Sequence, residues 1–239
     1  MKLKLIPLLL TAVFAAVPVL GQATGPGREM TVEESYLQDS IEALIIREKA
    51  RSASRENKLF ALENIGQAIE RGNTNEGILH TLEFLSLEGI LNRTTLNRRV
   101  INDFPDVRME AARHLGSFGT PEAVNTLIRI SNIETEPMVL QQAVTSLGMI
   151  ASDDYDLTIS TIIRLANRFH NAVSPPDNIL AFAIVEALSN IAGRNGGIND
   201  PAAWLLLTEI STGPYGPSVR ERAGQVLNEL RDHLFASAE

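Results

Sequence analysis

Apolar residues recur three and four positions apart along almost the whole chain from residue 31 onward. This spacing is typical of amphipathic helices with one buried face, and the strict alternation expected of strands is nearly absent. The short segments between the periodic stretches hold glycine, proline, asparagine and aspartate, which favour turns. The pattern predicts an all-α protein with helices over 32–52, 55–71, 75–88, 94–102, 106–118, 121–132, 138–151, 156–170, 177–193, 201–211 and 218–235.

Several of these predicted helices share one spacing. An alanine stands four residues before each of Leu115, Leu147 and Leu227, a valine eight residues before, and a proline ten before. The helix around Leu188 keeps the apolar spacing without the proline, and successive anchors lie 32, 41 and 39 residues apart. Such separations are typical of repeated helix pairs. A small residue midway along the i, i+4, i+8 row lets a neighbouring helix approach closely.

A second spacing marks the helices between the repeated ones. Thr120-Pro121 and Asp200-Pro201 each place a capping residue before a proline at the first helical position. Shifts of 80 and 35 residues superpose the apolar positions of three such helices. The unit is therefore a pair of antiparallel helices, called A and B, that is repeated along the chain. A single pair cannot bury its apolar face, so neighbouring pairs stack into one continuous core.

The clearest copy of this unit runs Asp106-Val107-Arg108-x-x-Ala111-Ala112-x-x-Leu115-Gly116 and then Gly119-Thr120-Pro121-Glu122-Ala123-Val124. It resembles a HEAT repeat, and among these the HEAT-like repeats of phycobilisome lyases. The resemblance covers residues 104–235 well and 55–90 loosely, whereas 32–52 and 92–102 do not follow it. It implies a right-handed α-solenoid of stacked antiparallel helix pairs, a HEAT- or armadillo-like superhelix.

Four parts of the chain are predicted from these patterns: a signal peptide over 1–23, a flexible lead over 24–31, divergent N-terminal helical repeats or a cap over 32–103, and HEAT-like repeats with a C-terminal capping helix over 104–239. The capping helix at 218–235 has apolar residues on one side and charges on the other. The helix at 32–52 is expected to cap the other end with the apolar residues Leu37, Ile41, Leu44 and Ile45.

The first segment has the three parts of a secretory signal. Lys2 and Lys4 precede an uncharged apolar run over 5–20, and small residues follow it. We expect cleavage after Ala23, with a cut after Gly21 as the near alternative. An uncleaved anchor is the other interpretation, because the uncharged stretch over 5–27 is long enough to span a bilayer. Cleavage predicts a periplasmic or secreted protein without stable membrane insertion, held together by its apolar core because it has no cysteine.

The net charge of the chain is −8, and it becomes −10 once Lys2 and Lys4 are removed. A surface this acidic repels phosphate groups, which argues against binding to nucleic acid or to anionic membranes. The partners expected are therefore proteins.

No pattern of catalytic or metal-binding residues emerges. The four histidines lack the H-E-x-x-H spacing, and no G-x-S-x-G elbow is present. The acidic run over 153–156 lacks the glycine and the glutamate of a calcium loop. The glycine-rich run over 193–197 fits the end of a helix. We therefore predict a protein that is not an enzyme and binds no cofactor or metal.

The resemblance also implies roles for particular residues. Arg108 and Arg220 occupy the repeat position at which HEAT proteins often carry an arginine that bonds to neighbouring repeats. In this family the B helices line the concave face, and Arg129, Arg164 and Glu209 share one position on them. The predicted partner-binding groove consists of Asn125, Arg129, Arg164, Arg168 and Glu209. The alternative for this set is a merely solvated polar face.

The function predicted from the sequence is that of an exported scaffold, without enzymatic activity, that binds a partner protein along the solenoid surface. Stacked helices offer a long curved surface, which suits the binding of partners better than the making of bonds. Two alternatives are carried with it: a structural subunit of a bacterial cell-envelope assembly, and a lyase or accessory enzyme of the HEAT-like type.

Overall fold

The computed structural model describes residues 31–150, 155–170 and 177–236. The predicted signal peptide, almost all of the predicted lead, and Asp153 and Asp154 of the acidic run lie outside these ranges. Ten of the eleven predicted helices are present in the described part of the chain, together with one short hairpin. The elements are α1 (Val32–Ala50), α2 (Arg55–Glu70), α3 (Glu76–Ser86), β1 (Thr95–Leu96), β2 (Arg99–Val100), α4 (Pro105–Phe118), α5 (Pro121–Ile133), α6 (Pro137–Ile150), α7 (Tyr155–His170), α8 (Asn178–Asn195), α9 (Pro201–Thr212) and α10 (Pro217–Ala236).

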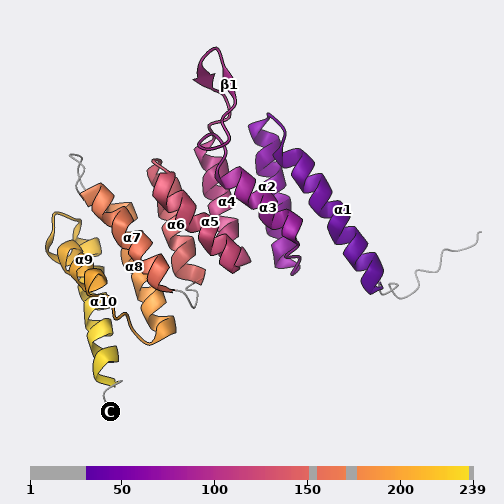
Figure 1. Ribbon diagram of the computed structural model, residues 1–239. Helices are drawn as coiled ribbons and strands as arrows, with labels where there is room; N and C mark the ends of the chain where they lie inside the picture. Colours follow the sequence, from indigo (N-terminus) through magenta and orange to yellow (C-terminus); the bar gives the residue numbers. More distant parts are fainter. Residues whose placement is uncertain (1–30, 151–154, 171–176, 237–239) are drawn as a thin grey trace, which may run out of the picture.

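The helices form two layers that run along the molecule from α1 at one end to α10 at the other (Figure 1). In the A layer α2, α4, α6, α8 and α10 pack in that order, each against the next. In the B layer α3, α5, α7 and α9 do the same, and α1 covers the start of both layers by packing on α2 and α3. The prediction of an all-α solenoid of stacked antiparallel pairs is confirmed.

Proline and capping residues start the helices as predicted. Pro105, Pro137 and Pro217 are the first residues of α4, α6 and α10. Proline is tolerated there because the first N–H groups of a helix have no partner within it. The hydroxyl of Thr120 accepts from the N–H of Ala123 at the start of α5, and the carboxylate of Asp200 caps α9 in the same manner. These signals fix where each helix begins.

The core consists of two apolar clusters that meet at α6. Val139, Ala143 and Leu147 of α6 belong to the cluster built with α1 to α5. Leu140 and Val144, one position further around the same helix, belong to the cluster built with α7 to α10. Because α6 is buried from both sides, it joins the two clusters into one continuous stack.

Neighbouring A helices touch through one recurring contact. A glycine follows Ile65 in α2, Leu115 in α4 and Leu147 in α6, and the residue before the anchor of the next A helix packs onto it. A Cβ atom on Gly116 would lie 2.6 Å from Ser146 Oγ, and one on Gly148 would lie 2.6 Å from Ala187 Cα. Between α2 and α4, however, the residue placed on Gly66 is the bulky His114. Small residues therefore bring α4, α6 and α8 together closely.

The helix predicted over 94–102 is wrong, because this segment forms a β-hairpin that stands out beyond the helical layers (Figure 1). Thr95 pairs with Val100 and Leu96 pairs with Arg99 in antiparallel register. The two turn residues, Asn97 and Arg98, both have positive φ, of 51° and 64°. Two consecutive left-handed residues are the mark of a tight type I′ turn, which fits the twist of paired strands. Leu96 and Val100 lie four residues apart, a spacing that is also typical of a helix, and the prediction was therefore misled.

A buried network of charges holds the base of this hairpin segment. Lys58 of α2, with 1% of its side chain exposed, lies 2.8 Å from Glu88 Oε1 and donates to the carbonyl of Ala50 at 2.8 Å. The amide of Asn102 donates to the carbonyl of Asn92 and to Glu88 Oε1, at 2.7 and 3.3 Å. Buried charges cost much free energy unless they are paired, so these contacts fix a single arrangement of the segment.

Arg108 extends this network into the repeats, as the HEAT resemblance implied. Its Nε donates to Glu134 at 2.7 Å, and its Nη1 donates to Asp103 at 2.6 Å and to the carbonyl of Glu88 at 3.2 Å. Glu134 in turn accepts from the N–H groups of residues 135 and 136, which lead into α6. Arg220, at the same position of the last repeat, is exposed, and within the described ranges no ion pair involves it.

The two end helices differ from each other. In α10 the predicted inner residues Val219, Ala223 and Val226 are buried, and the charges lie outside. In α1 the four apolar residues expected to cover this end of the array are all exposed, and three other residues of the same helix point inward. The exposed residues are Leu37, Ile41, Leu44 and Ile45, and the buried ones are Ala43, Ile46 and Ala50. The helix thus covers this end of the array, but it packs through Ala43, Ile46 and Ala50 and not through the apolar residues singled out in the sequence.

Among the described helices, none combines the length and the apolar composition that a bilayer-spanning segment requires.

Candidate binding site

The five residues predicted to bind a partner are all exposed, and all lie on the B layer. Asn125 and Arg129 belong to α5, Arg164 and Arg168 to α7, and Glu209 to α9. Because α5 packs on α7 and α7 packs on α9, the structure places these residues on three successive helices.

The repeat register aligns four of these residues with two others into one row. Asn125, Ser160 and Leu205 share one position on α5, α7 and α9, and Arg129, Arg164 and Glu209 share the position one turn later. Residues four apart lie one above the other on a helix face. The row, named here the B-layer row, consists of Asn125, Arg129, Ser160, Arg164, Leu205 and Glu209.

Within the residues that the structure describes, the two arginines of the B-layer row have no carboxylate partner. Arg164 donates to the hydroxyls of Ser160 and Thr161 on its own helix, at 3.3 and 2.8 Å. In the part of the chain that the structure describes, neither Arg129 nor Arg164 forms an ion pair. A row with two such guanidinium groups is suited to an acidic surface of another molecule, because arginine binds carboxylates through two parallel hydrogen bonds.

Arg168, by contrast, already has a structural task. It donates to the carbonyl of Asn132 at 2.9 Å and to that of Glu134 at 3.0 Å, at the end of α5. The last carbonyls of a helix lack partners within it, so this arginine ties α7 to the preceding B helix. Burial lowers the pKa of Arg168, and the nearby carboxylate of Glu134 opposes that shift. We therefore leave Arg168 out of the B-layer row.

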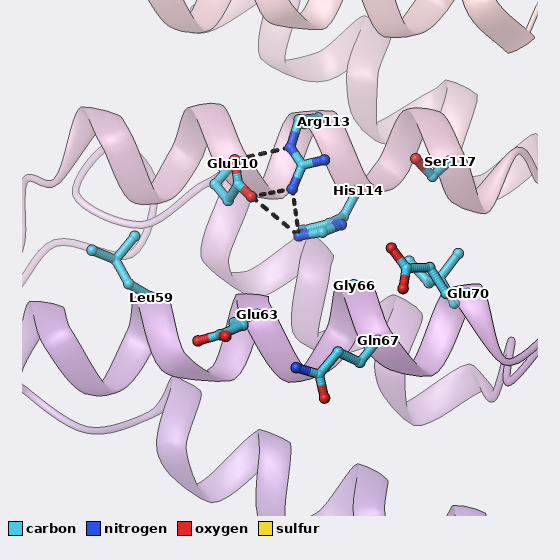
Figure 2. Close-up of a pocket in the computed structure, with 10 residues that line it drawn as sticks. Leu59, Glu63, Gly66, Gln67, Glu70, Glu110, Arg113, His114 and Ser117 are labelled. Carbon is cyan, nitrogen blue, oxygen red and sulfur yellow. Dashed lines mark hydrogen bonds and ion pairs between the residues drawn. The ribbon is translucent and has the colours of Figure 1, made fainter.

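A pocket between α2 and α4 was not predicted from the sequence. It has a volume of about 460 Å³ and opens to solvent between the two helices. Figure 2 shows Glu63, Gln67 and Glu70 of α2 lying across from Glu110, Arg113 and His114 of α4. The pocket exists where His114 stands in the recurring A-layer contact, since the next contacts hold serine and alanine instead.

The charges in this pocket form one linked group on α4. Arg113 Nε donates to Glu110 at 3.0 Å, and His114 Nε2 lies 3.4 Å from the same carboxylate. The hydrogen bond from Arg113 lowers the pKa of Glu110. Burial and the charge of Arg113 lower the pKa of His114, so its imidazole is neutral at physiological pH. Three carboxylates against one guanidinium give the pocket a negative charge.

The remaining residues singled out in the sequence have ordinary environments. His80 lies on the surface beside Glu83 at 3.0 Å and Glu76 at 3.4 Å, while His233 is exposed. Gly196 ends α8 in the left-handed conformation, with φ of 71°, as the glycine-rich run indicated. The side chain of His170 lies outside the part of the chain that the structure describes. Over the described ranges, no three histidine or acidic side chains are grouped so as to hold a metal ion.

Comparison with known proteins supports the repeat. A family model of HEAT repeats matches residues 96–168, from the hairpin to the end of α7. This match covers the clearest copy of the unit, which begins at Asp106, and the pair that follows it. No protein of curated function matches the chain in sequence.

A solved structure shares the fold across most of the chain. It is the complex of CpcE and CpcF of phycocyanin lyase from Nostoc sp. PCC7120, with a TM-score of 0.56 and 19% sequence identity. The similarity covers 91% of this chain and 70% of that chain. At this level of identity the comparison shows a common architecture of stacked helix pairs.

Proposed function

We propose that this HEAT-repeat protein is a scaffold that binds a partner protein along the B-layer row. The observation that carries the proposal is the exposure of Arg129 and Arg164 at one position of adjacent helices, without ion pairs in the described part of the chain. On a chain with a net charge of −8, this is a local site for an acidic partner. Leu205 adds an exposed apolar side chain to the same row.

The proposed partner is an acidic protein surface with an apolar group at the end that meets Leu205 on α9. Each exposed guanidinium can bind a carboxylate of the partner through a planar pair of hydrogen bonds. Solenoids present extended surfaces of this kind, on which several neighbouring repeats each contribute one or two contacts. Glu209 lies at the far end of the row, on α9. A basic group of the partner fits there, so the charges of the row favour one orientation of the bound partner.

The test is affinity purification with crosslinking from the native host, using the wild-type protein and the double variant Arg129→Glu/Arg164→Glu. We expect recovery of the main partner to fall roughly tenfold or more, since like charges would then face each other. The matched control is Arg220→Glu/Arg231→Glu, which makes the same change of charge on the exposed side of α10. Unchanged recovery with the first variant, or equal losses with both, would contradict the B-layer row as the binding site.

We also propose that the scaffold works outside the cytoplasm. The basic start, the apolar run over 5–20 and the small residues before Thr24 support export by a cleaved signal. N-terminal sequencing of the protein recovered from periplasmic or secreted fractions is expected to begin at Thr24. Protein that keeps Met1 and sediments with membranes would contradict this proposal.

The fold similarity to the phycocyanin lyase complex supplies a second candidate function, that of a lyase or its accessory. A protein of this kind would be recovered from the native host with bound pigment, and purification of colourless protein counts against it. A third candidate, a structural subunit of a cell-envelope assembly, predicts recovery in a stable complex of several different subunits. Both are distinguished from the scaffold by the same purification.

A further inference from the structure

The outer face of α1 is apolar over two turns. Leu37, Ile41 and Ile45 expose 62%, 51% and 56% of their surface, and Leu44 beside them exposes 48%. They follow the i, i+4, i+8 spacing and so form one stripe along the helix. Ala43, Ile46 and Ala50 meanwhile pack into the core on the opposite side. The helix is therefore apolar on both faces, which is typical of a helix with neighbours on two sides.

This stripe continues onto α2. Phe60 exposes 52% of its surface and lines, with Ile41, Ile45 and Lys49, a groove of about 390 Å³ between the two helices. Five large apolar side chains, each about half exposed, leave roughly 400–500 Å² of apolar surface, within the range of the largest patch that a typical monomer presents, which is often functional. Terminal helices of solenoids carry polar outer faces because an apolar one leads to association.

The distribution of charges along α1 indicates which partner the stripe fits. The first half, residues 31–41, holds Glu33, Glu34 and Asp39 and no basic residue, whereas 47–51 holds Arg47, Lys49 and Arg51 against one acid. A second copy of α1 laid antiparallel on the first therefore brings each acidic half against the other's basic half. A two-fold axis at Ile41 also places Leu37 of one copy near Ile45 of the other, so the stripe is complementary to itself.

We propose that two copies of this chain pair through their α1 helices, antiparallel and about a two-fold axis close to Ile41. An apolar area of 400–500 Å² per copy is about what the apolar part of a standard interface, near 800 Å² per partner, contains. The paired molecule has its B-layer rows on separate surfaces from the α1 stripe. The pairing therefore stands or falls independently of the proposed scaffold function.

The test is the mass in solution, measured by light scattering after size exclusion and by sedimentation equilibrium over about 1–100 µM. The wild-type chain, of 26.1 kDa, is expected to have twice its monomer mass at the higher concentrations. In Ile41→Glu two carboxylates meet at the axis, and we expect a monomer with unchanged circular dichroism. Ile179→Glu, which places the same charge at a similarly exposed position on α8, is expected to remain a dimer. A monomeric wild type, or an Ile41→Glu dimer, would overturn the pairing.

Exchange of charges tests the antiparallel direction. Glu33→Lys and Arg51→Glu each place like charges together twice in the dimer, and each is expected to raise the dissociation constant roughly three- to tenfold. The double variant Glu33→Lys/Arg51→Glu restores opposite charges across the interface and is expected to return close to the wild-type constant. The same charges also suit the dipole of α1 itself. A double variant weaker than either single variant would fit that explanation and contradict the antiparallel pair.

Residues 1–23 are a second occupant to be tested, because they include an apolar run. The mass is therefore measured for the full chain and for the chain that begins at Thr24. We expect both to be dimers. A dimer that disappears when residues 1–23 are removed, or one that both lengths form but that Ile41→Glu does not disrupt, would contradict pairing through α1.

Discussion

The two ends of the solenoid bury their last helices in opposite ways. At the C-terminal end α10 turns Val219, Ala223 and Val226 inward and presents Arg220 and Glu221 to solvent. At the N-terminal end α1 turns two alanines and one isoleucine inward and presents a stripe of larger apolar residues outward. The C-terminal end is closed in the way that a repeat array requires, whereas the N-terminal end presents an apolar outer face, on which the proposed pairing rests.

The same division appears in how neighbouring repeats are joined. From α4 to α8 the A helices meet through glycine against serine or alanine. Between α2 and α4 they meet through His114, and buried charges around Arg108 and Lys58 hold the intervening hairpin segment. The regular part is thus held by close packing of small residues together with neutral or half-buried polar contacts, whereas the N-terminal part also contains buried charges. Substitutions at matched positions of the two parts should therefore have different effects.

The largest difference is expected at the arginine position of the repeat. Arg108→Met leaves Glu134, which is 1% exposed, buried without its partner, and should reduce the free energy of unfolding by about 3–5 kcal/mol. Arg220→Met, at the same repeat position in α10, should change it by less than about 0.5 kcal/mol. Urea or guanidinium unfolding of both variants gives the comparison. Equal effects at the two positions would show that the network around Arg108 is not what holds this junction.

A smaller difference is expected at two helical glycines. In Gly148→Ala the new methyl group would lie 2.6 Å from the Cα atom of Ala187, so α6 and α8 must separate, at a cost of about 1–3 kcal/mol. In Gly224→Ala nothing lies within 4 Å of the new group, and the variant should be more stable by about 0.5–1 kcal/mol because alanine favours the helix. Thermal unfolding followed by circular dichroism measures both. A stabilised Gly148→Ala would contradict close packing in the regular part.

The smallest effect is a dependence on pH that arises from the pocket between α2 and α4. The folded pKa of His114 lies below its unfolded value of about 6.5, so the unfolded chain binds a proton first as the pH falls. The stability due to His114 is therefore complete above that value and declines as the pH drops below it. His80 has the opposite effect. The hydrogen bond to Glu83 raises the folded pKa of His80, so this histidine stabilises the folded state at low pH.

Unfolding free energies of the wild type, His114→Gln and His80→Gln between about pH 8 and pH 5.5 separate the two histidines. Relative to the wild type, His114→Gln should lose less stability on acidification, and His80→Gln should lose more. The lowered pKa of Glu110 affects stability only below the ordinary glutamate value of about 4, which is outside this pH window. Parallel curves for the wild type and His114→Gln would mean that the imidazole is not kept neutral by its surroundings.

Much of the regular part could be predicted from the sequence. The spacing of proline, valine, alanine and leucine before each anchor located α4, α6 and α10, because each of these residue types has one physical task there. Thr120 and Asp200 located the starts of α5 and α9 through their capping side chains. The repeat register also placed the five predicted groove residues on the exposed side of the B helices, whereas their role in binding stays a prediction.

The N-terminal part could not be predicted in the same way. An apolar pair four residues apart is shared by helices and by hairpins, and only the left-handed turn at Asn97 and Arg98 separates them over 94–102. In α1 the apolar residues lie on two faces, and periodicity does not say which face meets the core. The pocket at His114 depends on the contact of this side chain with Gly66 of the neighbouring helix. The two residues lie 48 positions apart in the chain, so no local pattern reveals the contact.

The central contrast, an open end at α1 and a closed end at α10, is tested most directly by crosslinking, because the chain has no cysteine of its own. Ile41→Cys and Arg220→Cys each place one exposed thiol on an end helix, and both are treated with a short bismaleimide at a concentration of about 20 µM. The account predicts a covalent dimer for Ile41→Cys and an essentially monomeric Arg220→Cys. A monomeric Ile41→Cys, or equal crosslinking at both ends, would contradict it.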